Sequence, residues 1–159
     1  MVKKTKNLGT RLKNLLNLQI GRISEAIEQE GRTLFGGANN LLGNEEISDF
    51  CMEFLHLLVA LLDAKDPFDD ASPQFHALEM FFNGLSRQIL MRGGRVEDLV
   101  RFNQFMQRTL IEAMENEESG ETASDLAELK ESLLFLSGTF NELNLAVFQA
   151  YLEEKEKTI

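Results

Sequence analysis

The C-terminal segment 122–157 carries the pattern that most constrains how this chain can fold. Apolar residues recur there at alternating spacings of three and four: Leu126, Leu129, Leu133, Leu136, Phe140, Leu143, Val147 and Ala150. This is the a/d pattern of a heptad repeat, and it stays in phase for more than three heptads. A second apolar stripe runs along the same segment, formed by Leu134, Leu145, Phe148 and Leu152. At about 100° per residue, the two stripes lie roughly 140° apart on one helix.

A helix with two nearly opposed apolar faces needs two partners, because each face is stable only when it is covered. One face can cover the helix's own domain, and the other can meet a second copy of the chain. We therefore predict that the heptad stripe, from Leu126 to Ala150, is a homodimer interface, and that the second stripe faces the domain core. The seam loses its apolar character at Glu154 and Lys157, so the paired helices are expected to be loosely held where they leave the domain. Gly138 is the expected flex point within the seam.

The composition predicts an all-α chain that forms one domain over residues 1–159. Leu, Glu, Gln and Met are abundant, β-branched residues are few, and there are 2 Pro among 159 residues. Apolar periodicity and end signals predict five helical regions: 8–34, with a break near Gly21; 45–64; 73–92; one from Val96 to the polar loop at 116–121; and 122–157. The last helix would be about 54 Å long.

Charge is unevenly distributed along the chain. Segment 1–22 contains six basic residues and no acid, whereas the remainder holds 10 basic and 26 acidic residues, a net charge of −16. An acidic body repels phosphate, so nucleic acid is not expected as a partner. The basic N-terminal segment 1–22 is expected to be solvated or to complement an acidic patch on a neighbouring subunit; contact with another anionic partner is the less favoured alternative.

No residue pattern indicates catalysis, a metal or a cofactor. Glu53 and His56 have the E-x-x-H spacing of di-iron bundles, but the second such pair is missing, because His76 has Pro73 three residues before it. Both histidines fall on polar helix faces and are expected at the surface. The lone Cys51 lies among apolar residues and is expected in the core. We predict a chain that is not an enzyme. The longest apolar run is too short to span a bilayer and no secretory signal is visible, which predicts a cytoplasmic location without membrane contact.

The order of the helical segments resembles a known family. A Phe-rich helix ends in Arg92-Gly93-Gly94, "RVEDLVRFNQFMQRTLIEAM" follows at residues 95–114, and a polar loop leads into "ESLLFLSGTFNELNLAVFQAYLEE" at residues 131–154. From about residue 44 to 157, this resembles the N-terminal sensory domain of RsbR-type stressosome proteins. The resemblance lies in the helix lengths, the glycine at one helix break and the long final helix.

The resemblance implies a globin-like, all-helical sensory domain that lacks haem and dimerises partly through its final helix. It also implies a downstream STAS domain, phosphorylated by a partner serine/threonine kinase, and assembly of dimers into a large stressosome scaffold. The chain reaches Ile159 before a STAS domain would begin, so it is expected to be either an isolated sensory module or a truncated piece of a longer protein. We therefore expect a signal-input domain that relays a change through helix 122–157. A haem-binding globin-coupled sensor and a plain helical scaffold remain as alternatives.

Overall fold

The computed structural model describes residues 2–117 and 123–157, with side chains described for 12–116 and 126–157. These residues form five α-helices and one short 3₁₀ turn, with no strand in the described ranges: α1 Val2–Phe35, η1 Gly37–Asn39, α2 Asn44–Leu62, α3 Pro73–Met91, α4 Val96–Glu117 and α5 Ala123–Lys157. The prediction of an all-α fold with a long C-terminal helix is confirmed. α1 is kinked at Gln19, close to the break expected at Gly21. The loop predicted at 116–121 lies largely outside the described residues.

Local sequence signals set several helix ends. The Ser72 side chain caps α3 by accepting a hydrogen bond from the Phe75 backbone N–H at 3.1 Å, with Pro73 in the first turn. Beyond the other end of α3, Gly93 adopts a φ of 94°, a left-handed conformation that favours glycine. The following Gly94 donates its N–H to the Ile89 carbonyl at 2.9 Å. A Cβ on Gly94 would lie only 2.4 Å from the Ile89 side chain, so this turn requires glycine.

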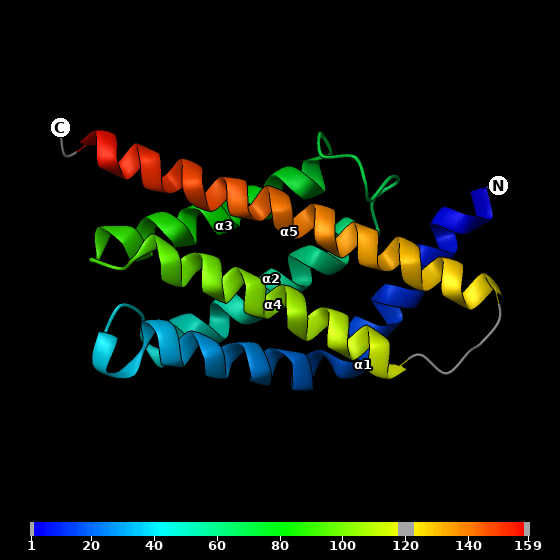
Figure 1. Ribbon diagram of the computed structural model, residues 1–159, viewed down its shortest axis with the longest axis horizontal. Helices are drawn as coiled ribbons and strands as arrows, with labels where there is room; N and C mark the ends of the chain where they lie inside the picture. Colours follow the sequence, from blue (N-terminus) through cyan, green and yellow to red (C-terminus); the bar gives the residue numbers. More distant parts are fainter. Residues whose placement is uncertain (1, 118–122, 158–159) are drawn as a thin grey trace.

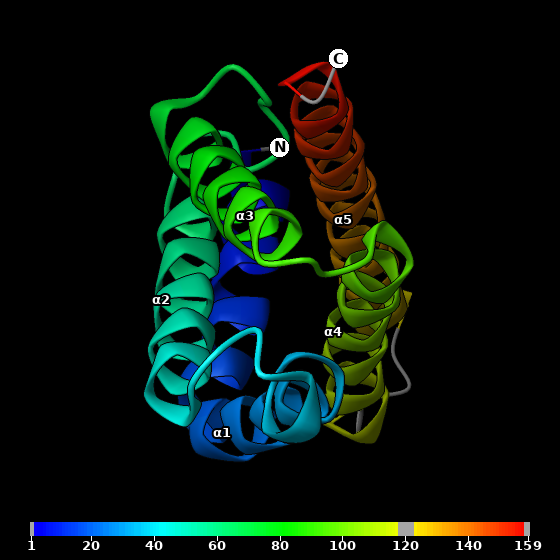
Figure 2. The same cartoon turned by 90° about the vertical axis from the view of Figure 1, so that its left-hand side faces the viewer.

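The helices pack so that α5 runs along the length of the molecule against both α3 and α4 (Figure 1). α1 packs against α2 and α4, and α2 packs against α3. Viewed end on, the α2–α3 pair and the α4–α5 pair lie on opposite sides of the molecule, and α1 lies along one end (Figure 2). α3 and α5 also pack directly against each other. This arrangement leaves α5 with one side against the domain and the other side at the surface.

Phenylalanine rings fill the interior and connect all five helices. Phe50 of α2 lies 5.2 Å from Phe81, 6.1 Å from Phe82 and 5.8 Å from Phe102, measured between ring centroids. Further contacts extend the cluster to α1, through Phe35 and Phe102 at 5.3 Å, and to α5, through Phe54 and Phe140 at 5.9 Å. Buried aromatic pairs of this kind contribute roughly 0.5–1.5 kcal/mol each beyond the area that they bury.

In the structure, the heptad stripe of α5 lies mainly in the core of the single chain and the second stripe lies at the surface. Five residues of the predicted dimer seam are fully buried within the single chain: Leu136, Phe140, Leu143, Val147 and Ala150. Of the rest of the seam, Leu129 and Leu133 are half-buried and Leu126 is exposed. The second stripe, which was expected in the core, is exposed to solvent. The seam therefore serves mainly as the core face of α5, because α3 and α4 already cover it. α5 passes through Gly138 without a break.

This arrangement predicts that Leu143 supports folding within one chain. Replacing the fully buried Leu143 with alanine should lower the free energy of unfolding by about 2–5 kcal/mol, because the change leaves a cavity between α5 and its neighbours. The measurement is urea unfolding followed by circular dichroism.

Leu18→Ala is the control for this variant, because Leu18 is 78% exposed and its loss should change the free energy of unfolding by about 0.5 kcal/mol or less. If Leu143→Ala gave a stable, folded monomer with an unchanged urea midpoint, Leu143 would belong to an interface between copies instead.

Candidate functional site

The first candidate surface is the exposed apolar stripe of α5. Leu134, Leu145, Phe148 and Leu152 are 56%, 60%, 46% and 60% exposed, respectively. Their spacings of 11, 3 and 4 residues place them on one side of the helix, opposite the buried residues. Isolated apolar residues on a surface need no explanation, whereas a row of large ones along a single helix is a candidate for an interaction surface.

Polar contacts fix the position of α5 relative to α3 and α4. Asn83 of α3 donates a hydrogen bond to the Ala146 carbonyl at 3.2 Å. Asn103 of α4 is buried and donates to the Phe140 carbonyl at 3.2 Å and to the Asn144 side chain at 2.6 Å. These contacts hold one register of α5, because a shift along its axis would leave buried polar groups without partners.

An ion pair joins the far ends of α3 and α5. The Arg87 guanidinium of α3 contacts the Glu153 carboxylate, close to the point where α5 leaves the domain. Both side chains are about one third exposed, so the pair is only partly screened by water. The ion pair therefore links α3 directly to the C-terminal end of α5.

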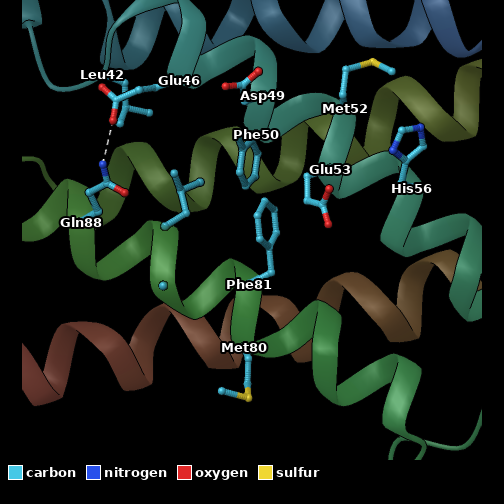
Figure 3. Close-up of a pocket in the computed structure, with 12 residues that line it drawn as sticks. Leu42, Glu46, Asp49, Phe50, Met52, Glu53, His56, Met80, Phe81 and Gln88 are labelled. Carbon is cyan, nitrogen blue, oxygen red and sulfur yellow. Dashed lines mark hydrogen bonds between the residues drawn. The ribbon is translucent and has the colours of Figure 1, made fainter.

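The second candidate surface is a groove between α2 and α3, with a volume of about 860 Å³. Phe50 of α2 and Phe81 of α3 stack across its middle with planes 8° apart (Figure 3). Glu46 and Gln88 lie at one end, and Met52 and His56 lie towards the other. The volume falls within the range of small-molecule sites, which are typically apolar clefts with a few polar groups.

Hydrogen bonds close the Glu46 end of the groove. Glu46 accepts hydrogen bonds from Gln88 at 2.9 Å and from Arg92 at 3.2 Å, and it also accepts from the Gly43 backbone N–H at 3.0 Å, which caps α2. The Gly43 N–H and then the Arg92 guanidinium stabilise the carboxylate, and so the pKa of Glu46 is lowered from its ordinary value of 4.5. Arg92 also donates to the Leu41 carbonyl at 2.7 Å.

The two histidines and the single cysteine lie where the sequence predicted. His56 and His76 are both exposed, as predicted; His76 lies 3.9 Å from Glu79, and His56 lines the α2–α3 groove. Cys51 is fully buried, as predicted, and burial raises the pKa of its thiol to about 12, which keeps it protonated and unreactive. Within the described ranges, no group of three or more His, Cys, Asp or Glu side chains is placed to hold a metal ion.

The basic N-terminal segment 1–22 has one described ion pair with the body of the domain. Lys13 contacts the Asp63 carboxylate, just beyond the end of α2, at 2.8 Å. Arg22 lines a second, smaller cavity of about 320 Å³ between α1 and α4. The other basic side chains of the segment, from Lys3 to Arg11, lie outside the described side chains.

Together, these observations describe an all-helical domain with an exposed apolar face on α5 and a groove between α2 and α3. The family model of the RsbT co-antagonist protein rsbRD N-terminal domain matches residues 20–159. This covers most of the chain, and the chain therefore belongs to the RsbRD N-terminal domain family, as the sequence resemblance implied. The family is regulatory, not catalytic.

No curated protein and no solved structure matches the chain significantly. Over the part of the chain that the structure describes, no helix has the length and apolarity needed to cross a bilayer.

The lowered pKa of Glu46 predicts a defined response to acid. The stabilising effect of this carboxylate is present above the pKa that it has in the unfolded chain, and it is lost as the pH falls through the lower pKa of the folded state. In Glu46→Gln the side chain can still accept from Gly43 but has no proton to gain. The urea midpoint of this variant should therefore fall less than that of the wild type between neutral pH and pH values below 4.5.

Glu45→Gln is the control, since Glu45 is the exposed neighbour of Glu46 in the same helical turn. Equal acid sensitivity of the wild type and Glu46→Gln would contradict the assignment of Glu46 as a carboxylate stabilised by folding.

Proposed function

We propose that this chain is the signal-input domain of an RsbR-type protein and acts as a co-antagonist of RsbT within a stressosome. In this proposal the domain forms a homodimer, and a change in the paired α5 helices is passed to a downstream STAS domain that is the target of a kinase partner. Family membership supports the regulatory context. A globin-like arrangement without haem and a cytoplasmic location are parts of the same proposal.

One observation carries the dimer proposal, namely that α5 is part of the core on one side and apolar and exposed on the other. Leu145 and Phe148 remain 60% and 46% exposed after the chain has folded, although Leu143 and Val147 beside them are fully buried. A second copy that covered this stripe would remove apolar surface from water, at about 25 cal/mol for each Å² buried. The proposed interface is thus the exposed stripe, in place of the buried part of the heptad seam.

The relay proposal follows from the same helix. A signal must favour one of two arrangements of the α5 pair, because an input that interacts equally with both shifts nothing. α3 contacts α5 through Asn83 and Arg87, so a displacement of α3 changes how the α5 helices meet. Beyond Leu152 the helix carries Glu153, Glu154, Lys155, Glu156 and Lys157, and this charged exit would pair loosely and rotate readily.

The dimer proposal predicts that charges on the exposed stripe separate the copies without unfolding them. The wild type should sediment at twice 18.0 kDa at micromolar concentrations. The double variant Leu145→Glu/Phe148→Glu should sediment as a monomer with an unchanged helical circular dichroism spectrum, since both side chains point to solvent within one chain.

Gln29→Glu/Gln104→Glu is the matched control for this variant, because it adds two negative charges at exposed positions of α1 and α4. A wild-type chain that stayed monomeric across this concentration range, or a stripe variant that stayed dimeric, would rule out the proposed interface.

The alternative of a haem-based sensor is disfavoured by the positions of the histidines. The chain has 2 His, and both side chains are exposed rather than buried among the phenylalanine rings of the interior. A haem iron needs an axial ligand inside its pocket, and His is the ligand in globins. The alternative of a plain helical scaffold is less favoured, because the exposed apolar stripe of α5 and the α2–α3 groove both favour a binding role.

We therefore expect the purified chain to be colourless and to give no Soret band when haemin is added in equimolar amount. The absence of a buried histidine is the physical reason. A Soret band that disappeared in His56→Ala or His76→Ala would favour the haem sensor and contradict this prediction.

A further inference from the structure

The α2–α3 groove has a glycine in its wall that the helix itself does not need. Gly84 lies in the middle of α3, is exposed and lines the groove. Glycine weakens a helix relative to alanine. A Cβ at Gly84 would meet no atom within 4 Å, so neither packing nor backbone conformation requires the missing side chain. What Gly84 provides is open space along the groove.

The groove also has two carboxylates without a counter-ion. Asp49 and Glu53, one turn apart on α2, both line the groove and are exposed, and no ion pair to either is found among the described residues. None of the residues lining the groove is a lysine or an arginine. Glu46, in contrast, already has Arg92 as its partner. Two like charges on adjacent turns repel each other, and a bound cation would relieve that repulsion.

The rest of the lining is apolar and polarisable. Phe50, Phe81 and Leu85 form part of the wall, and the thioether of Met52 lies towards the His56 end (Figure 3). Aromatic faces attract cations, and thioethers adapt to irregular apolar ligands. The groove thus combines an apolar surface with negative charge.

We propose that the α2–α3 groove binds a small amphiphilic cation, in which an alkyl chain or ring system carries one amine or quaternary ammonium group. The apolar part lies against Phe50 and Phe81 in the space beside Gly84, and the positive group faces Asp49 and Glu53. The proposal of a binding site is argued from the residues of the groove alone. Only the step from ligand binding to signal output rests on the proposed signal-input role. In that step the ligand changes the distance between α2 and α3, and α3 passes the change to α5 through Asn83 and Arg87.

The experiment measures binding of three probes to the intact chain by isothermal titration calorimetry, each below its micelle-forming concentration. Octyltrimethylammonium carries the tail and the positive head, octyl sulfate carries the same tail with a negative head, and tetramethylammonium carries the head alone. We expect saturable binding of the first probe only. Methyl resonances of ¹³C-labelled methionine localise the site: the Met52 signal should shift, whereas the signal of Met114, which is buried in α4, should not.

Two sets of variants test the two parts of the proposed site, namely the carboxylates that face the positive group and the space beside Gly84 that holds the apolar part. Asp49→Asn and Glu53→Gln should each weaken octyltrimethylammonium binding about two- to five-fold, as expected for exposed charges. The double variant Asp49→Asn/Glu53→Gln has its control in Glu25→Gln/Glu112→Gln, which makes the same charge change on α1 and α4, outside the groove, and should have no effect. Gly84→Leu should abolish binding by filling the groove, with a melting temperature at or above that of the wild type. Gly21→Leu is its control, since Gly21 also has no neighbouring atom within 4 Å.

The outcomes separate this site from the signalling role. Equal binding of octyl sulfate, unchanged affinity in Asp49→Asn/Glu53→Gln, or undiminished binding to Gly84→Leu would overturn the proposal, as would no binding of octyltrimethylammonium to the wild type. Any of these results would leave the dimer of the signal-input role intact. Groove-specific binding to a chain that remains monomeric would support the site and count against the dimeric relay.

Discussion

The contact between phenylalanine rings at the centre of the molecule is the interaction on which the other features depend. Phe50 touches rings of α2, α3 and α4, and the neighbouring pairs extend the cluster to α1 and α5. Because interiors are close-packed, the packing of these rings sets the distance between α2 and α3 in this structure. It therefore sets the floor of the groove, where Phe50 and Phe81 stack, and it also sets the side on which α5 meets the domain.

Much of the helix order followed directly from the sequence. Apolar spacing and end signals such as Ser72-Pro73 and Gly93-Gly94 located α2 to α5 within a few residues, because these signals act over one or two turns and do not depend on the rest of the fold. Residues whose burial depends only on their own helix face, such as Cys51, His56 and His76, were also placed correctly.

The sequence did not allow us to predict which of the two apolar faces of α5 lies in the domain core. Spacings of three and four describe an apolar stripe equally well whether α3 and α4 or a second copy covers it. Leu143 and Leu145 are the same residue type two positions apart, yet one is fully buried and the other is 60% exposed. The difference is set by contacts across the chain, such as the hydrogen bond from Asn83 to the Ala146 carbonyl, and these leave no local signal. The groove could not be predicted for the same reason. Asp49 and Gly84 lie on different helices, and they line one groove only because α2 and α3 pack against each other.

α3 connects the two candidate surfaces. Gly84 faces the groove, and Asn83 and Arg87, one position before it and three after, contact α5. Neighbouring positions on a helix point about 100° apart, so one turn of α3 can face both surfaces at once. In the proposed relay, the α3 turn from Asn83 to Arg87 is the route from a ligand between α2 and α3 to the exit of α5. In the proposed relay α3 moves as a unit, so a shift at the groove carries Phe81 and Arg87 together and reaches Glu153 through the Arg87 ion pair.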